Sequence, residues 1–327
     1  MLALGKLLEL TLAGREPSEK IQVCASGARL RWRLDGVLAV DPPAGRDGGV
    51  DLLLSAGIHG DESAAVELLE RLLHDIAACR LVPALRLLLV LGNPAALRRG
   101  VRYVEHDLDE LFGGHDPSAS GADALRAVEL ELQAAQFFAG TGRHRWHLDL
   151  RAGARPSQVG PFAVRPPRAQ PPSRAELASL QAAGIAALLL EEQPAATFAA
   201  FTATHCAAES LALELGAAPG ALERPLAWLR LLIAGGVPAG DASALRLFRS
   251  SRELRRHGQG FRLYVDEAAA NFAALPPGSL LAEDGDGRRW LVEETDARIV
   301  FANPRAAEGQ RAGLVAVPLA LDAQASE

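Results

Sequence analysis

The chain has 327 residues, of which 49% are hydrophobic and 23% are charged, and its formal net charge is −6 at pH 7. This composition is typical of a globular protein with a sizeable apolar core and excludes a wholly disordered chain, and at about 150 residues per domain the length corresponds to one large domain or two. The acidic balance disfavours nucleic acid as a partner, because such an interface needs clustered basic residues.

Cysteine usage and hydropathy indicate the compartment. The three cysteines, at positions 24, 79 and 206, are widely spaced and form no CxxC pair, so neither a disulfide framework nor a thiolate zinc site is expected. No run of 18 uncharged apolar residues occurs, and the N-terminal segment carries Lys6 and Glu9 and lacks a cleavage signature. We therefore expect a cytoplasmic protein with no membrane partner.

The first clear element along the chain is a short apolar strand at 51–56, followed by a glycine-flanked turn and a helix from 63 onward. Further strands are predicted at 86–91, 146–150, 185–190 and 211–215, and further helices at 122–138, 174–183 and 225–233. Residues 152–172 are rich in Pro, Gly and Arg and predict a long loop. Short strands alternating with helices predict an α/β domain with a largely parallel or mixed sheet.

From about residue 240 the pattern changes to short β-like runs separated by turn residues. These runs lie at 261–265, 280–282, 289–292, 297–301 and 313–317. We therefore predict two domains: an α/β domain over residues 1–240, which would carry the catalytic site, and a small all-β C-terminal domain over residues 241–327.

His59 and Glu62 lie directly after the first predicted strand, in the turn that enters the helix. In an open α/β sheet the ligand crevice lies outside the carboxyl ends of the strands. The H-x-x-E spacing in such a turn lets an imidazole and a carboxylate reach one metal ion, and a catalytic zinc usually takes three such protein ligands and a water. The structural alternative is an ordinary turn histidine, with a glutamate that stabilises the helix N-terminus through the dipole.

Four segments in chain order carry a family resemblance: GIHGDESAAVELL, GNPAALRRGVRYVEHDLDELF, HLDLRAGARPS and LALELG. In this order they resemble the succinylglutamate desuccinylase and aspartoacylase family of zinc hydrolases, which is related to the zinc carboxypeptidases. The resemblance runs essentially from end to end. It implies a zinc-carboxypeptidase-like mixed sheet flanked by helices, a small all-β C-terminal domain, and one zinc ion as cofactor.

The resemblance also implies a role for each matching residue. His59 and Glu62 match the first two zinc ligands, and Glu214 matches the glutamate that activates the zinc-bound water and relays a proton to the leaving amine. Arg102 matches an arginine that holds a substrate carboxylate, a role that suits a planar bidentate guanidinium. Apart from the resemblance, the position of Glu214 between two leucines of a strand indicates a carboxylate that faces a crevice.

The chain departs from this family at the third zinc ligand. The family has a histidine in a D-L-H motif, and this chain has Arg151 in that place. A guanidinium stays protonated and offers no lone pair, so Arg151 is no ligand and places a positive charge beside the metal. On the same strand face His147 lies about 13 Å back and Asp149 about 7 Å back, which makes Asp149 the better stand-in. We therefore expect reduced zinc affinity, and the metal's identity stays open.

A second departure concerns the substrate. The family carries an Asn-Arg pair in a D-L-N-R-L-F motif, which binds the carboxylate end of the substrate, and this chain has Asp109 and Glu110 at those positions. Together with Arg102 these two acids form the predicted substrate-binding set. Because succinylglutamate is a tricarboxylate, we expect the two added negative charges to repel it.

By resemblance the chain is a metal-dependent amide hydrolase that converts N-succinylglutamate and water to succinate and glutamate, a step of arginine catabolism by the succinyl pathway. Its partner would be a small carboxylated amide. The two departures leave an alternative open, a non-catalytic or substrate-shifted paralogue on the same fold. A third hypothesis is that no metal binds and that the added acids serve a cationic ligand. The sequence does not indicate the oligomeric state.

Overall fold

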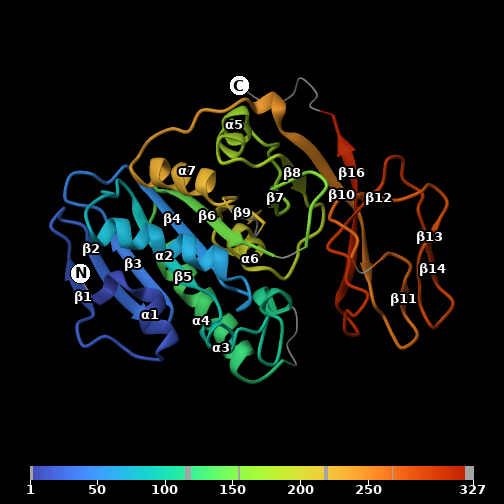
Figure 1. The fold of residues 1–327 in the computed structure, drawn as a ribbon, viewed down its shortest axis with the longest axis horizontal. Coiled ribbons are helices and arrows are strands. Elements are labelled where there is room, and N and C mark those ends of the chain that lie inside the picture. The colour runs from blue at the N-terminus through green and yellow to red at the C-terminus, as the bar shows by residue number, and fades with distance from the viewer. Residues whose placement is uncertain (1–2, 115–118, 154, 217–219, 267, 321–327) are drawn as a thin grey trace. The chain divides into compact units, whose positions relative to one another are not determined.

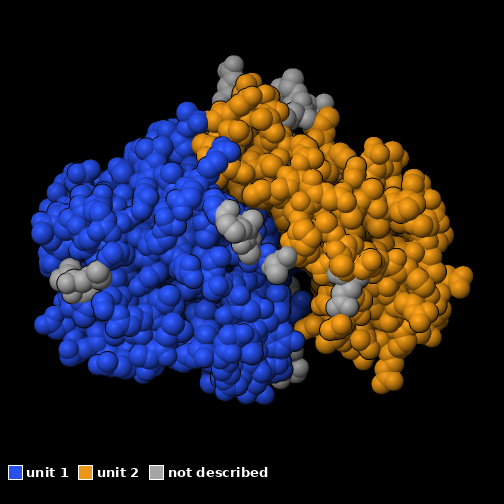
Figure 2. Space-filling view, viewed as in Figure 1, with its two compact units in different colours: residues 1–153, 194–239 blue, residues 154–193, 240–327 orange. Residues whose placement is uncertain are grey.

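The structure, a computed structural model, describes residues 3–114, 119–153, 155–216, 220–266 and 268–320. The chain forms two compact units, one made of residues 1–153 and 194–239 and the other of residues 154–193 and 240–327, coloured blue and orange in Figure 2. The units differ from the predicted domains in residues 154–193, which join the second unit because one of their two strands pairs with a strand of the C-terminal part. The domain boundary itself stays a prediction.

The first unit is built on a mixed sheet with the strand order β1-β2-β3-β5-β4-β6-β9 (Figure 1). Its strands are β1 (Ile21–Val23), β2 (Arg29–Leu34), β3 (Val37–Asp41), β4 (Val50–Ala56), β5 (Arg86–Leu91), β6 (His144–Arg151) and β9 (Glu209–Glu214). The pairs β4–β5, β4–β6 and β6–β9 are parallel, whereas β1, β2, β3 and β5 pair antiparallel in turn. The carboxyl ends of β4, β6 and β9 therefore meet at one edge of the sheet.

Helices cover both faces of this sheet. They are α1 (Leu7–Leu12), α2 (Ser63–Ala77), α3 (Pro94–Arg99), α4 (Ala122–Phe137), α6 (Phe198–His205) and α7 (Glu223–Ile233). One apolar cluster joins α4 and α6 to β3, β4 and β5 through side chains such as Leu53, Leu130 and Phe198. On the other side α2 contacts β4 and β6, and α7 contacts α2. This arrangement confirms the predicted α/β class with a mixed sheet flanked by helices.

Burial on both faces explains why the central strands are continuous apolar runs. Successive side chains of a strand point to opposite faces, so a strand with helices on both sides has no solvent-facing row. In β4 every residue from Asp51 to Ala56 is buried, and in β5 every residue after Arg86 is buried. Their apolar runs were therefore readable in the sequence.

The turn after β4 depends on a glycine. A Cβ on Gly60 would lie 2.2 Å from the carbonyl carbon of Ala96, in the backbone of α3. No side chain fits at that distance, so the turn can pack against α3 only with glycine at this position. The Gly60 N–H also donates to the carbonyl oxygen of Arg102 at 3.1 Å, which ties the turn to the loop that follows α3.

Most strand pairs of the second unit are antiparallel, and three strands at one edge of its sheet pair in parallel. Its strands are β7 (Phe162–Arg165), β8 (Ala187–Leu190), β10 (Arg246–Arg255), β11 (Arg262–Leu263), β12 (Ala273–Ala274), β13 (Leu280–Glu283), β14 (Arg289–Leu291), β15 (Arg298–Val300) and β16 (Arg311–Leu319), and its helix is α5 (Arg174–Ala182). The strand orders are β7-β8-β10-β16-β15-β12 and β11-β13-β14. The β-rich character predicted beyond residue 240 is confirmed.

One local prediction is wrong. The segment 152–172 is not a continuous loop, because Phe162–Arg165 forms β7, which pairs in parallel with β8. This strand is four residues long and is flanked by glycine and proline, so only its pairing identifies it. Across the described ranges, no helix of the chain is long and apolar enough to cross a membrane.

Candidate active site

The predicted site residues meet where three strands of the first unit end. His59 and Glu62 follow β4, Arg151 is the last residue of β6, and Glu214 is the last residue of β9. Arg151 and Glu214 are direct partners in the parallel register of β6 and β9. Asp109 enters from η2, a short 3-10 helix over Leu108–Glu110. Five residues from four separate segments therefore surround one position at the carboxyl edge of the sheet.

His59 lies between two carboxylates. Its Nδ1 is 2.9 Å from Glu62 Oε1, its Nε2 is 2.9 Å from Asp107 Oδ1, and the side chain is 3% exposed. Burial by itself would lower the pKa of this imidazole, but the hydrogen bonds to Asp107 and Glu62 and the charges of Asp107 and Asp109 outweigh burial and raise the pKa to about 9. At neutral pH the ring is therefore a cation that donates from both nitrogens.

Glu62 is held as a carboxylate on both oxygens. Oε1 accepts from His59, and Oε2 accepts from the backbone N–H of Ala152 at 3.1 Å. Burial would raise the pKa of Glu62, yet the His59 hydrogen bond, the charge of Arg151 and the Ala152 N–H lower it to about 2. The predicted first two metal ligands are thus together, and each already has partners within the protein.

Arg151 is the centre of the cluster. Nη1 and Nη2 donate to the two oxygens of Asp109 at 2.6 and 2.8 Å, and Nε and Nη2 donate to one oxygen of Asp149 at 2.7 and 2.5 Å. Nη1 also lies 3.3 Å from Nδ1 of His59. Burial alone would lower the pKa of Arg151, but the charges of Asp109 and Asp149 raise it well above its ordinary value. The guanidinium is permanently charged in the place predicted for a metal ligand.

Asp149 is fixed from behind by a chain of buried polar groups. Ser55 Oγ donates to Asp149 Oδ1 at 2.6 Å and lies 2.8 Å from Nε2 of His147, whose Nδ1 is 2.7 Å from Thr202 Oγ. Because the Ser55 proton is used on Asp149, His147 donates from Nε2 to Ser55 Oγ, and its Nδ1 lies against the Thr202 hydroxyl. Burial and the charge of Arg151 lower the pKa of His147 to about 3, so the ring is neutral, as this direction of donation requires.

The substrate-binding set lies beside this cluster. Arg102 is half exposed, and its Nε donates to Asp107 Oδ2 at 3.1 Å. Asp109 is paired with Arg151, and Glu110 is the last, partly buried residue of η2. The negative charge that the sequence adds at Asp109 is therefore offset by Arg151, which weakens the repulsion expected for an anionic substrate.

Glu214 differs from the other acids of the site. Removal from water raises the pKa of its carboxyl, the charge of Glu62 raises it further, and the charges of Arg151 and His59 offset part of this, which leaves a pKa of about 7. A carboxyl with this pKa is populated in both protonation states near neutral pH. It is suited to accept and return a proton, which is the role that the family resemblance implies for Glu214.

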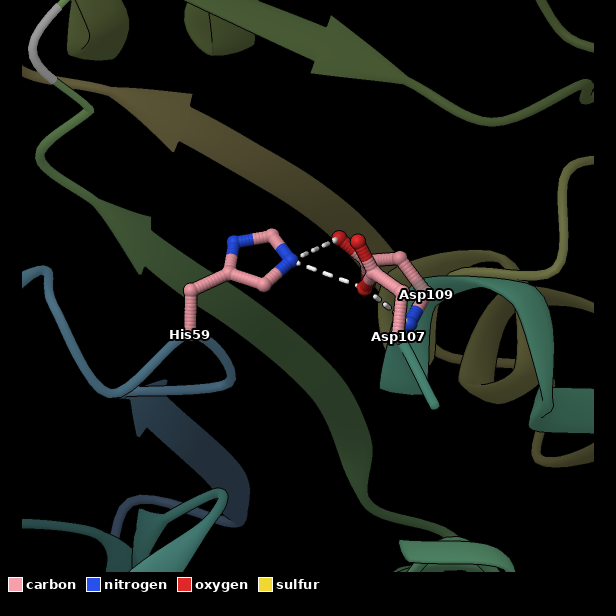
Figure 3. A group of neighbouring side chains, drawn as sticks. All are labelled: His59, Asp107 and Asp109. Carbon is pink, nitrogen blue, oxygen red and sulfur yellow. Dashed lines mark hydrogen bonds and ion pairs between the residues drawn. The ribbon is translucent and has the colours of Figure 1, made fainter. Parts of the chain in front are cut away.

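Figure 3 shows a group that could hold a metal ion: His59, Asp107 and Asp109, with ligand atoms within 4.8 Å of one another. The charges around the group are already matched, because Arg151 pairs with Asp109 and Arg102 pairs with Asp107. The family's zinc does not fit at His59 and Glu62, the two predicted ligands, as they are arranged. A guanidinium nitrogen of Arg151 lies 3.3 Å from Nδ1 of His59 and has no lone pair for a metal ion. Zinc and the ligand roles of His59, Glu62 and Asp149 therefore stay predictions.

Three residues of the site were not predicted from the sequence. Asp107 bonds both His59 and Arg102, and Ser55 and Thr202 orient the buried histidine behind Asp149. Asp107 begins the quoted D-L-D-E-L-F segment, so its position was visible although its partner was not. Nothing local marks Ser55 or Thr202, because their partners lie 92 and 55 residues away in the sequence.

Two family models match the chain. Residues 48–229 match the succinylglutamate desuccinylase/aspartoacylase catalytic domain, and residues 243–319 match the AstE/AspA barrel-sandwich hybrid domain. Together they span most of both compact units.

Relatives match over the whole length. A protein of Pseudomonas aeruginosa named succinylglutamate desuccinylase is 51% identical over 332 residues, covering 98% of this chain and 100% of the relative. The crystal structure of the succinylglutamate desuccinylase from Chromobacterium violaceum is 34% identical, has a TM-score of 0.83, and is matched over 97% of this chain and 98% of its own. The corresponding structure from Vibrio parahaemolyticus is 29% identical with a TM-score of 0.86, over 96% and 95% of the two chains.

Proposed function

The chain belongs to the succinylglutamate desuccinylase/aspartoacylase family, and on this premise we propose that it hydrolyses the amide bond of N-succinylglutamate to give succinate and glutamate. The observation that carries the proposal is the whole-length likeness to relatives of that name. The same likeness supports the hydrolase over the alternative of a non-catalytic or substrate-shifted paralogue. The proposed reaction agrees with a cytoplasmic enzyme of arginine catabolism that acts on a small carboxylated amide.

We assign proton transfer to Glu214. As a carboxylate it takes a proton from the water whose oxygen attacks the amide carbon, and it then gives this proton to the amide nitrogen as the C–N bond breaks. Water is consumed, and succinate and glutamate are released with no other reactant. A pKa of about 7 supports both halves of this cycle at neutral pH.

Arg102 is the proposed anchor for a substrate carboxylate. Its guanidinium is half exposed at the rim of the cluster, and Nε is oriented by Asp107. An arginine held in this way presents a planar set of donors to a carboxylate. Asp109 opposes anion binding less than its charge suggests, because Arg151 neutralises it. No step of this proposal is assigned to a metal ion.

The test is glutamate release from N-succinylglutamate by the purified full chain, with and without added zinc. We expect the wild type to release glutamate and Glu214→Gln to lower kcat/KM by about 10²–10⁴-fold. The matched control is Glu209→Gln, at the exposed other end of the same strand, which should retain activity. Lack of release by the folded wild type under both conditions contradicts the proposed function, and full activity of Glu214→Gln contradicts the assigned role.

A further inference from the structure

The geometry points to an arginine that replaces a metal ion. We infer that the guanidinium of Arg151 is the resident cation at His59 and Glu62, so that this chain organises its site without zinc at these residues. The central observation is that Nη1 lies 3.3 Å from Nδ1 of His59, the same nitrogen that faces Glu62 Oε1 at 2.9 Å. The inference goes beyond the proposed function, and it is tested by metal content rather than by turnover.

Four of the five N–H groups of this guanidinium donate to carboxylates of the protein. Nε and one hydrogen of Nη2 face Asp149, the other hydrogen of Nη2 and one of Nη1 face Asp109, and the last hydrogen of Nη1 is directed to the His59 side. A side chain with four donors on carboxylates and an exposure of 5% is held firmly in this position. A surface arginine that only rotates toward a metal site would lack these fixed partners.

Arg151 is also held from its far side. Asp149 is fully buried, and its second oxygen accepts from Ser55, which in turn is fixed by His147. If the guanidinium turned away to admit an ion, Asp149 would be left as an unpaired buried charge, which is strongly unfavourable. The cluster therefore resists the rearrangement that metal binding needs.

The ligand count leads to the same conclusion. The two predicted ligands, His59 and Glu62, offer one imidazole nitrogen and one carboxylate oxygen, and Arg151 adds none, whereas a catalytic zinc takes three protein ligands. A divalent ion there would also lie within hydrogen-bond distance of a permanent positive charge, and the repulsion between them is strong in a site with little water. The guanidinium thus supplies no ligand at this position, and its charge repels a metal ion.

Asp109 and Arg151 form a matched pair. They lie 42 residues apart in the sequence, and both oxygens of the carboxylate are engaged by the guanidinium. The acid at position 109 provides the charge that a buried guanidinium at position 151 needs. Two substitutions together, Arg151→His and Asp109→Asn, should therefore be needed to create a metal site here.

The experiment measures zinc bound per chain, by elemental analysis and calorimetric titration, on the full-length protein. We expect the wild type and His59→Gln to hold the same amount of zinc, and a chelator to leave the Tm of the wild type unchanged. The double variant Arg151→His with Asp109→Asn should bind one further zinc. Its Tm should rise by about 5–10 °C at a zinc concentration about 100 times Kd.

Arg151→Lys with Asp109 retained is the matched control, because it keeps a cation but adds no ligand, and it should gain no zinc. One zinc more in the wild type than in His59→Gln would overturn the inference, as would a folded double variant that gains none. If the double variant fails to fold by circular dichroism, the comparison of wild type with His59→Gln still decides. Because none of these readouts uses turnover, an inactive wild type would contradict the proposed function and leave this inference standing.

Discussion

Each compact unit contains an arginine that is held by two carboxylates. In the first unit Arg151 bonds Asp149 and Asp109, and in the second unit Arg311 bonds Glu253 and Glu191. Glu253 lies in β10, which pairs with the strand of Arg311, and Glu191 follows β8, which pairs with β10 on its other side. This second network fastens neighbouring strands to one another.

The two networks differ in what lies beyond the carboxylates. Arg151 also faces His59, and its strand partner Glu214 carries a pKa raised to about 7, whereas Arg311 joins an acid of β10 to one that follows β8. The burial of a charged pair is therefore no functional signal by itself, since the same chemistry serves strand pairing in one unit. A functional site is indicated instead by the titratable groups that the charged pair holds in place.

The largest expected effect comes from removing the two arginines. Arg151→Met should lower the free energy of unfolding by about 3–5 kcal/mol, because it leaves fully buried Asp149 without its cation. Arg311→Met should cost less, about 1–3 kcal/mol, since Glu253 keeps contact with water and Arg255, and Glu191, with a side chain 5% exposed, is less completely buried than Asp149. Urea unfolding of both variants checks the order. A larger loss for Arg311→Met would contradict the view that burial of the partner acid determines the cost.

The next effect concerns pH. The pKa of Glu214 is about 7 in the folded chain and 4.5 as the ordinary value, so the native state binds this proton more tightly than the unfolded state. The resulting stabilisation is fully present below about pH 4.5, is lost as the pH rises through 7, and is on the order of 3 kcal/mol in total. Urea unfolding from pH 4.5 to 8 should show this loss in the wild type and a smaller loss in Glu214→Gln. Equal pH profiles of unfolding for the wild type and Glu214→Gln would contradict a raised pKa of Glu214.

The smallest effect is expected for an exposed pair of the first unit. Arg71 of α2 and Glu223 of α7 form an ion pair at 3.0 Å, with side chains 47% and 64% exposed. Arg71→Ala should change the free energy of unfolding by less than about 1 kcal/mol, and less still at high salt. A loss as large as that of Arg311→Met would show that distance, and not burial, decides the worth of these pairs.

The amino-acid sequence by itself determined the sheet-and-helix framework and where its chemistry lies. The apolar runs of β4 and β5 are visible because both faces of these strands are covered, and the glycine-flanked turn marks the end of β4. From this framework the positions of His59, Glu62, Arg151 and Glu214 at the strand ends follow. Short strands such as β7 were not predicted, because only pairing with a distant segment stabilises them.

Only the tertiary structure decided what these residues do to one another. The sequence showed Arg151 as a lost ligand and Asp109 as a repelling charge, and the structure joins them into one ion pair. The register that sets Ser55 opposite Asp149 likewise connects His147 to the site. Such pairings depend on distances between segments 42 to 94 residues apart, and these distances are set by strand register and helix packing rather than by local residue patterns.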